Sequence, residues 1–313
     1  MDATLASIIA AAAPLIYAAV GEAITERAGI VNLSLDGSIL LSAMTGFAVA
    51  LTTGRVGLGF AAAAGVSALV ALLVAWSGIR LRLNQVAVGF VLTLLAAAVA
   101  SYLGEGFVHQ PGPSVAPRPM PVLADIPVVG RALFGQNLSV YGSLLLVVAT
   151  AWFLARSRRG LALKAVGERP EVAHARGINV NRYRYLAALL GGSLVGVAGA
   201  AFSLDQKLGW SDGHTAGFGW IALAIVIFGG WQPLRVALGC YLFGALQVVA
   251  LRLQSRVPGL AQILPSIPFP LMIFALVLVN SAGLRRLLAR SPRISRWLLP
   301  EAPAALGRNF VPE

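Results

Sequence analysis

Apolar stretches without Asp, Glu, Lys or Arg alternate with short polar connections along the chain. A helix that crosses a bilayer needs about 20 apolar residues, with a usable range of about 17–25. Eight of the nine stretches reach that range, and the shortest does so when Leu251 and the stem of Arg252 lie at the membrane interface. The nine are residues 3–21, 37–54, 56–79, 83–104, 132–155, 185–204, 213–234, 236–251 and 257–284. The pattern predicts an all-α integral membrane protein with about nine hydrophobic segments.

Composition supports the same class. Of the 313 residues, 58% are apolar and 12% are charged, whereas a soluble domain carries about 25% charged residues. Too few polar groups remain to cover a water-soluble body, which excludes soluble, disordered and disulfide-rich classes. The first segment lacks a basic leader and a cleavage site, so we expect it to remain as a helix. Gly and Pro interrupt several segments, so we expect one to be re-entrant or broken, and 37–54 could enter and return on one side.

The distribution of Lys and Arg sets the expected orientation, because cytoplasmic loops carry an excess of these residues. With the N-terminus outside, the regions 22–36, 78–84, 156–184, 230–235 and the tail from 281 lie inside. Together they hold 18 of the 24 Lys and Arg residues. The net charge of +12 is therefore mainly an inner-face signal, and nucleic acid is not an expected partner. We predict a multi-pass protein with its N-terminus outside and its C-terminal tail in the cytoplasm.

Few polar side chains fall within the predicted segments, and those that do lie near segment ends. They are Asn32, Asp36, Asn84, Gln85, Gln247 and Asn280. An ion-coupled transporter normally places an ionisable residue deep in its bundle, and only Asp36 comes near to that. No Ser/His or paired-carboxylate constellation is expected at one depth, which disfavours a membrane hydrolase. With no HExxH, CxxC or GxxxxGK[ST] motif and a single cysteine, Cys240, the chain has no recognisable ATP-hydrolysing or zinc machinery.

The connection 156–184 contains the start and stop signals of a short helix between two spans. Pro170 suits a first helical turn, an acidic residue follows it at the positive end, and Gly177 supplies a stop. We predict a helix of about two turns over 168–176, with Ala173 small enough to permit close docking into a groove. An ordinary positive-inside loop would explain the arginines but not these helix start and stop signals.

Three separated motifs give the chain a family resemblance. Residues 164–180, KAVGERPEVAHARGINV, resemble the coupling loop of ABC-importer permeases that serve branched-chain amino acids, simple sugars and nucleosides. Residues 22–37, EAITERAGIVNLSLDG, and 215–233, TAGFGWIALAIVIFGGWQP, are similar to signatures of the nucleoside and simple-sugar branch. The resemblance runs in register from about residue 5 to 283. Asp36 departs from the branch, which usually has Glu there.

The resemblance implies that two permease subunits surround one pathway, with two cytoplasmic ATPase domains below and an extracytoplasmic substrate-binding protein above. We expect the second permease to be a different homologous chain. The chain would be a non-catalytic subunit that binds no cofactor or metal, because ATP and Mg would be held by the partner ATPase. The coupling residues would be Gly167, Glu168, Arg169, Pro170, Ala173 and Gly177.

The substrate pathway would be lined by Asn32, Asp36, Asn84, Gln85, Phe218 and Trp220. The two aromatic residues would stack on a base or sugar face, and anchoring at the membrane interface is the alternative for them. Nucleosides are the preferred small polar substrate, simple sugars such as ribose come second, and branched-chain amino acids third. An ion-coupled secondary transporter is the alternative from another class.

The expected permease domain is 1–283, which includes the coupling loop 156–184 and a Pro-rich outer loop, 105–137. That outer loop could be a plain connector or a docking surface for an external partner. The basic cytoplasmic tail, 284–313, lies outside the resemblance, and we expect it to contact anionic lipid or to be disordered. We predict location in a bacterial inner (plasma) membrane.

Overall fold

The computed structural model describes residues 2–120, 130–254 and 302–311, with scattered positions between 266 and 281. Most of the ninth predicted segment, 257–284, and most of the basic tail lie outside the described residues. Within them the structure is helical. The elements are α1 (Asp2–Arg27), α2 (Leu35–Thr53), α3 (Val56–Ile79), α4 (Gln85–Gly104), η1 (Glu105–Phe107), α5 (Gly130–Phe134), α6 (Leu138–Arg156), α7 (Arg158–Glu168), α8 (Pro170–Ala175), α9 (Val180–Ala201), η2 (Phe202–Gln206), α10 (Phe218–Gly229) and α11 (Pro233–Gln254).

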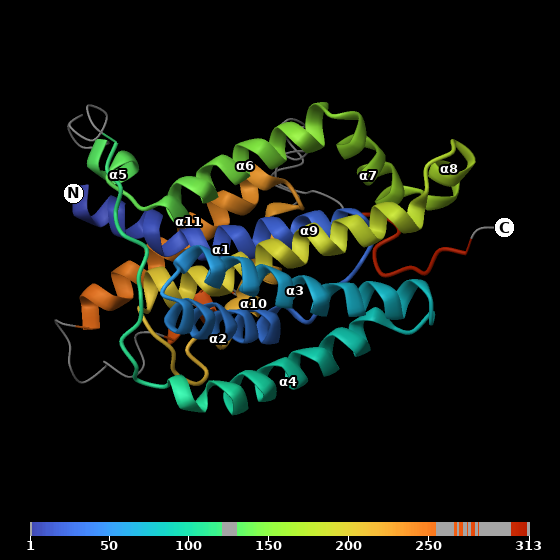
Figure 1. Ribbon diagram of the computed structural model, residues 1–313. Helices are drawn as coiled ribbons and strands as arrows, with labels where there is room; N and C mark the ends of the chain where they lie inside the picture. Colours follow the sequence, from blue (N-terminus) through green and yellow to red (C-terminus); the bar gives the residue numbers. More distant parts are fainter. Residues whose placement is uncertain are drawn as a thin grey trace.

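The long helices form an elongated bundle around α1 and α9, which run side by side through its middle (Figure 1). Helix α1 also contacts α6, α10 and α11, while α9 contacts α2 and α3. Helix α4 lies along one edge of the bundle, and α7 and α8 project from one end (Figure 1). Seven helices of the described part are long and apolar enough to cross a membrane. The predicted fold class is confirmed, whereas the count of nine segments is not.

The segment 213–234 was predicted as a full membrane span, and this is wrong as a helix assignment. Its helix, α10, has only 12 residues. Gly217 (φ 86°) and Gly230 (φ 60°) have left-handed backbones at its two ends, a conformation that terminates a helix and that other residues rarely adopt. Residues 207–217 are therefore a connection, and α10 begins well inside the bundle.

Small residues let the central helices approach closely. The backbone at Gly21 of α1 lies against Gly191 of α9, and Gly192, Gly196 and Gly199 of α9 lie against α3 and α2. A side chain at any of these five positions would collide with a neighbouring backbone or side chain. The glycines of α9 therefore serve helix packing, as small residues commonly do between membrane helices.

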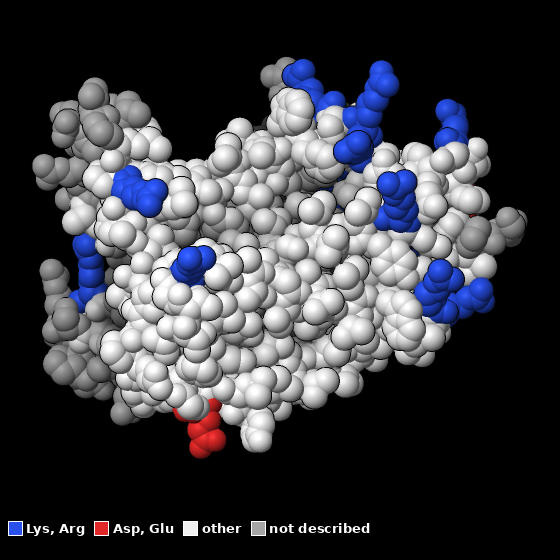
Figure 2. Space-filling model, in the orientation of Figure 1, with Lys and Arg blue, Asp and Glu red and all other residues white. Residues whose placement is uncertain are grey.

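The connections predicted to lie inside meet at one end of the bundle. The Arg27 side chain donates hydrogen bonds to the carbonyl oxygens of Gly230 (3.3 Å) and Trp231 (3.2 Å), and the backbone N of Val31 donates to Gln85 Oε1 (2.9 Å). Figure 2 shows Lys and Arg side chains gathered over this end, where α7 and α8 project. Helices α1, α3 and α6 run toward this end and α4, α9 and α11 run away from it, so the connections that carry most of the positive charge lie together.

Candidate functional site

Two helices, α2 and α10, begin within the bundle rather than at its ends. Gly37 in the first turn of α2 lies against the backbone of Thr93, the ninth residue of the 20-residue helix α4. Phe218, the first residue of α10, packs on Phe243 with ring centroids 6.1 Å apart. Phe243 is ten residues into the 22-residue helix α11, which is about 15 Å from its start. The N-termini of α2 and α10 therefore both lie near mid-depth.

Asp36 joins these two N-termini. Its Oδ1 accepts a hydrogen bond of 2.9 Å from the backbone N of Gly219, and its side chain is half-buried. Gly219 lacks a side chain where one would overlap the backbone of Asp36. Each helix N-terminus carries unpaired N–H groups and a partial positive charge of about half a unit. The arrangement therefore holds one carboxylate between two positive helix ends, where a polar group of a substrate could also bind.

Phe218 lines a cavity of about 370 Å³ beside this junction. Its ring makes edge-to-face contacts with Phe202 (4.5 Å between centroids) and Phe269 (6.2 Å). The same cavity is lined by the amides Gln206 and Gln247, among other residues. Aromatic faces combined with a few amides suit a flat polar ligand, which stacks on rings and hydrogen-bonds at its edge. The sequence motifs singled out Phe218 but gave no signal for Phe202, Gln206 or Phe269, which come from other parts of the chain.

Trp220 lies on another side of the same helical turn. Its side chain is 40% exposed and packs at a tilt on Phe90 of α4, with ring centroids 6.4 Å apart. It does not line the cavity of Phe218. The two aromatic residues predicted to act together therefore have different surroundings. Both are nevertheless direct neighbours in the chain of Gly219, whose backbone N binds Asp36.

The three amides predicted for the pathway have hydrogen bonds that shape the backbone. Asn32, fully buried, accepts from Ser34 N (3.2 Å), and Gln85 Oε1 accepts from Val31 N (2.9 Å). Asn84 caps α4 at the inner end by accepting from Val86 N (2.9 Å). Asn32 and Gln85 hold the connecting segment 28–34 that carries the chain from α1 back into the bundle. Of the predicted pathway residues, Asp36, Phe218 and Trp220 lie at the junction of α2 and α10, with the two rings on different sides of it, while Asn84 lies apart at an exposed end.

Two buried carboxylates were missed. Helix α1 extends past the predicted end at residue 21, and Glu22 (0% exposed) and Glu26 (3%) lie one turn apart on it. Glu22 Oε1 accepts from Asn32 N (3.3 Å), and Glu26 accepts a short hydrogen bond from the indole N–H of Trp231. The segment pattern suggested an interior almost free of acidic groups, whereas the structure buries these two carboxylates in it. These carboxylates tie α1 to the segment 28–34 and to the end of α10.

The predicted coupling residues fall on two short helices at the basic end. Gly167 and Glu168 end α7, and Pro170 begins the six-residue helix α8, which is shorter than the predicted 168–176. Gly167 is buried against the backbone of Arg27, so it faces the bundle. Arg169 is exposed between the two helices, and Gly177 ends the turn after α8 with φ 80°.

Ala173 was predicted to pack into a groove of a partner, but it is 3% exposed within this chain. It belongs to a small cluster with Val166, Val180 and Phe310. The surface that α8 leaves exposed carries Glu171, Val172, His174 and Ala175. Lys164 of α7 lies nearby. Partial burial of its amine and the charge of Arg27 lower its pKa.

At the opposite end, His214 lies between Trp210 and Ser203. Its Nε2 is 3.2 Å from Ser203 Oγ, which corrects the expectation that no Ser/His pair shares one depth. Burial lowers the pKa of His214 to about 4, so the ring is neutral near pH 7. Ser203 is fully buried within η2 and lines none of the four cavities described. The pair is therefore a structural contact between η2 and the connection 207–217.

Comparison with known proteins gives the family. The family described as "Branched-chain amino acid transport system / permease component" matches residues 4–278. The chain belongs to this permease family. The match covers α1 to α11 of the permease and stops before residues 302–311.

Three relatives show where the permease lies within the family. It is 40% identical over 255 residues to "Putative glucose ABC transporter permease protein TsgC13" of Haloferax volcanii, covering 80% of this chain and 78% of the relative. It is 35% identical over 271 residues to "Nucleoside ABC transporter permease protein NupC" of Lactococcus lactis subsp. cremoris, covering 83% and 85%. It is 29% identical over 315 residues to "Guanosine ABC transporter permease protein NupQ" of Bacillus subtilis, covering 96% and 93%.

Family membership confirms the resemblance carried by the three motifs. The permease is a multi-pass membrane protein, and permeases of ABC transporters work with an ATPase and a binding protein. Asp36, Gly219 and the residues that line the Phe218 cavity all fall inside the matched region. They form the candidate site of the permease.

Proposed function

We propose that this chain is the transmembrane subunit of an ATP-driven importer for nucleosides, and that it forms half of the translocation pathway. The observation that carries this proposal is the meeting of α2 and α10 at Asp36, beside the cavity of Phe218. Helices interrupted at mid-depth, with their N-termini turned toward one point, are typical of substrate pathways in membrane transporters. Rings and amides in the adjoining cavity suit a base, and the relatives named for nucleoside and guanosine transport support the same cargo.

The free energy for moving the substrate would come from ATP bound and hydrolysed by the partner ATPase. ATP and Mg would be bound there, and the permease would be non-catalytic. Closure of the ATPase domains would move α7 and α8, and Gly167 would pass that movement to the end of α1, on which it packs. The segment 28–34 then leads directly to Asp36. Because ATP binds the closed ATPase more tightly, it biases the permease toward one access state.

The same proposal includes the surroundings of the chain. The permease would lie in a bacterial plasma membrane with the α7–α8 end in the cytoplasm, because that end carries most Lys and Arg residues. A second, homologous permease would complete the pathway. An extracytoplasmic binding protein would deliver the substrate at the end formed by residues 105–120 and 207–213.

A simple sugar is the second candidate cargo, favoured by the relative named as a glucose permease. Uptake of radiolabelled nucleosides and ribose separates the two in cells that express the chain with its genomic neighbours. We expect accumulation of a nucleoside that disappears when the ATPase is inactivated. Uptake of ribose alone would replace the cargo, and uptake that survives without the ATPase would overturn ATP coupling.

A further inference from the structure

Residues 302–311, here called the strap, bind to the inner end of the bundle instead of extending into solvent or lipid. Pro303, Ala305 and Phe310 are buried. This corrects the expectation of a disordered or lipid-bound tail for these ten residues. Five hydrogen bonds fasten the strap: Ala305 N to Gly167 O (2.9 Å), Gly307 N to Gly29 O (3.0 Å), Ala304 N to Glu168 Oε2 (3.3 Å), Arg184 Nη1 to Arg308 O (3.0 Å) and Asn309 Nδ2 to Arg82 O (3.0 Å).

These bonds join parts of the chain that otherwise meet at few points. Gly167 and Glu168 end α7, Gly29 begins the segment that leads to Asp36, and Arg184 is in α9. Arg184 is 1% exposed, and the strap carbonyl at Arg308 is its hydrogen-bond acceptor. The strap therefore holds α7 and α8 in a fixed position against α9 and the 28–34 segment.

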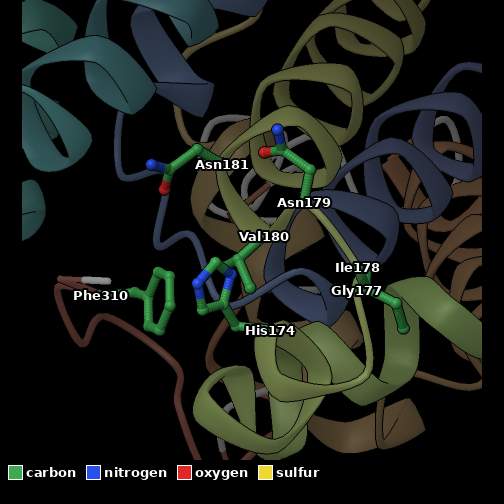
Figure 3. A pocket seen from close by; sticks show the side chains of 7 residues that line it. All are labelled: His174, Gly177, Ile178, Asn179, Val180, Asn181 and Phe310. Carbon is green, nitrogen blue, oxygen red and sulfur yellow. The ribbon is translucent and has the colours of Figure 1, made fainter. Parts of the chain in front are cut away.

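Phe310 connects the strap to α8 directly. Its side chain is 9% exposed and meets the ring of His174 edge-on, with centroids 5.5 Å apart. Figure 3 shows the two rings beside each other, and both line a cavity whose other lining residues are 177–181. That cavity measures about 340 Å³, and a second of about 330 Å³ lies beside Phe310 and Tyr185. The strap thus supplies one wall of each of two hollows on the cytoplasmic surface.

The rim of these hollows is basic. Arginine side chains are exposed around them on the α3–α4 turn, on the α8–α9 turn, on α9 and on the strap: Arg80, Arg82, Arg176, Arg182 and Arg308. A partner that fits this surface would present an apolar side chain for the hollow and acidic residues for the rim.

We propose that the strap and α8 together form the docking surface for the ATPase, with an apolar ATPase side chain seated in the cavity between His174 and Phe310. The inference rests on the proposed function, because it takes the cytoplasmic partner to be the ATPase. It adds a segment that lies outside the matched family region to the surface that receives the ATPase. The strap has two tasks in this arrangement: it walls the socket, and it holds α8 in place beneath it.

Affinity of the ATPase for detergent-solubilised permease tests the proposal. We expect Phe310→Ala to weaken ATPase binding at least tenfold, because it removes a wall of the socket that holds the buried apolar side chain of the ATPase. Phe310→Leu should restore most of it. Leu58→Ala, at an exposed position in the first turn of α3 and at the opposite end of the bundle, is the control and should bind as the wild type does. Arg176→Glu should weaken binding further at low salt than at high salt.

A second measurement does not depend on the folding of the Phe310 variant. Cys240 is fully buried, so a cysteine introduced by His174→Cys can be labelled selectively with a maleimide. We expect the ATPase to protect this cysteine and to leave a cysteine introduced by Leu58→Cys, at the opposite end of the bundle, reactive. Unchanged labelling of the His174→Cys variant in the complex, or wild-type affinity of Phe310→Ala, overturns the proposal. If the wild-type chain itself bound no ATPase, the proposed function would fail instead.

Discussion

Asp36 Oδ1 and the backbone N of Gly219 are 2.9 Å apart, although 183 positions separate them in the chain. This hydrogen bond joins the N-termini of α2 and α10 near mid-depth. We expect Asp36→Ala to reduce nucleoside uptake about tenfold, because it removes a charge-assisted hydrogen bond worth about 1.5–3 kcal/mol at this junction. Asp36→Glu, the acid common in the related branch, should retain most activity. Radiolabelled uptake measures the effect, and ATPase co-purification should be unaltered, since Asp36 lies far from α8.

Gly219 makes the same junction testable by packing. A methyl group there would overlap the backbone of Asp36, whereas a methyl group at Gly65 on α3 would meet nothing within 4 Å. We expect Gly219→Ala to destabilise the permease by about 1–3 kcal/mol, the usual cost of overpacking. Gly65→Ala is the matched control and should be neutral or slightly stabilising. Thermal unfolding in detergent distinguishes them, and equal midpoints would contradict the close approach of α2 and α10.

Gly177 sets the turn between α8 and α9. Its φ of 80° is outside the reach of proline, and its N–H donates to His174 O (2.8 Å). Gly177→Pro removes that bond and forces a different turn, so we expect ATP-driven uptake to be lost while membrane insertion is retained. Comparing uptake with the amount of protein in the membrane fraction tests this. Uptake at the wild-type level would show that the position of α8 does not matter for transport.

Glu168→Arg probes the same region through charge. The carboxylate accepts a hydrogen bond from Ala304 N and interacts electrostatically with Arg27. Arg169 is the next residue in the chain. We expect the reversed charge to loosen the strap and to lower ATPase-dependent uptake at least tenfold. Glu168→Gln retains an acceptor and is the control. Maleimide labelling of a cysteine introduced by Ala305→Cys should increase in the arginine variant and not in the glutamine variant.

His214 gives the permease a pH-dependent stability. Its pKa is about 4 in the folded chain and about 6.5 when unfolded, so the unfolded chain binds the proton more readily. Stability is therefore full above about pH 6.5 and declines as the pH falls toward 4. Between pH 7 and pH 5 the loss should be about 2 kcal/mol. Thermal unfolding across this range should show the decline in the wild type and a shallower one in His214→Gln; parallel curves would exclude His214 as the cause.

The sequence predicted the class, the basic end and several of the local stops, because each depends on neighbouring residues. Pro170 at the first turn of α8 and the left-handed backbone at Gly177 are examples. It failed where a feature depends on distant parts of the chain. Dividing the chain at charged residues removes Glu22 and Glu26 from every segment by construction, yet both are buried in α1.

One broken segment was expected, but 37–54 was singled out for it, and the short helix is α10. Gly217 and Gly230 flank it, and paired glycines are a stop signal even in an uncharged run. The cavity of Phe218 could not have been predicted, because Phe202, Gln247 and Phe269 come from η2, α11 and the region after it. Nor does any local pattern in residues 302–311 point to Gly29, almost the whole chain away.

That distance has a consequence for the time at which the inner surface is completed. Gly29 and Gly307, joined by a 3.0 Å hydrogen bond, are separated by 278 positions. At roughly 5–20 residues per second, a ribosome needs about 15–55 s to make the chain between them. During that interval the helices can enter the membrane, and from the time they are made His174 lacks its aromatic neighbour and Arg184 lacks its acceptor. A nascent chain therefore presents an unfinished surface to the cytoplasm, and completion of the strap marks the moment at which assembly can begin.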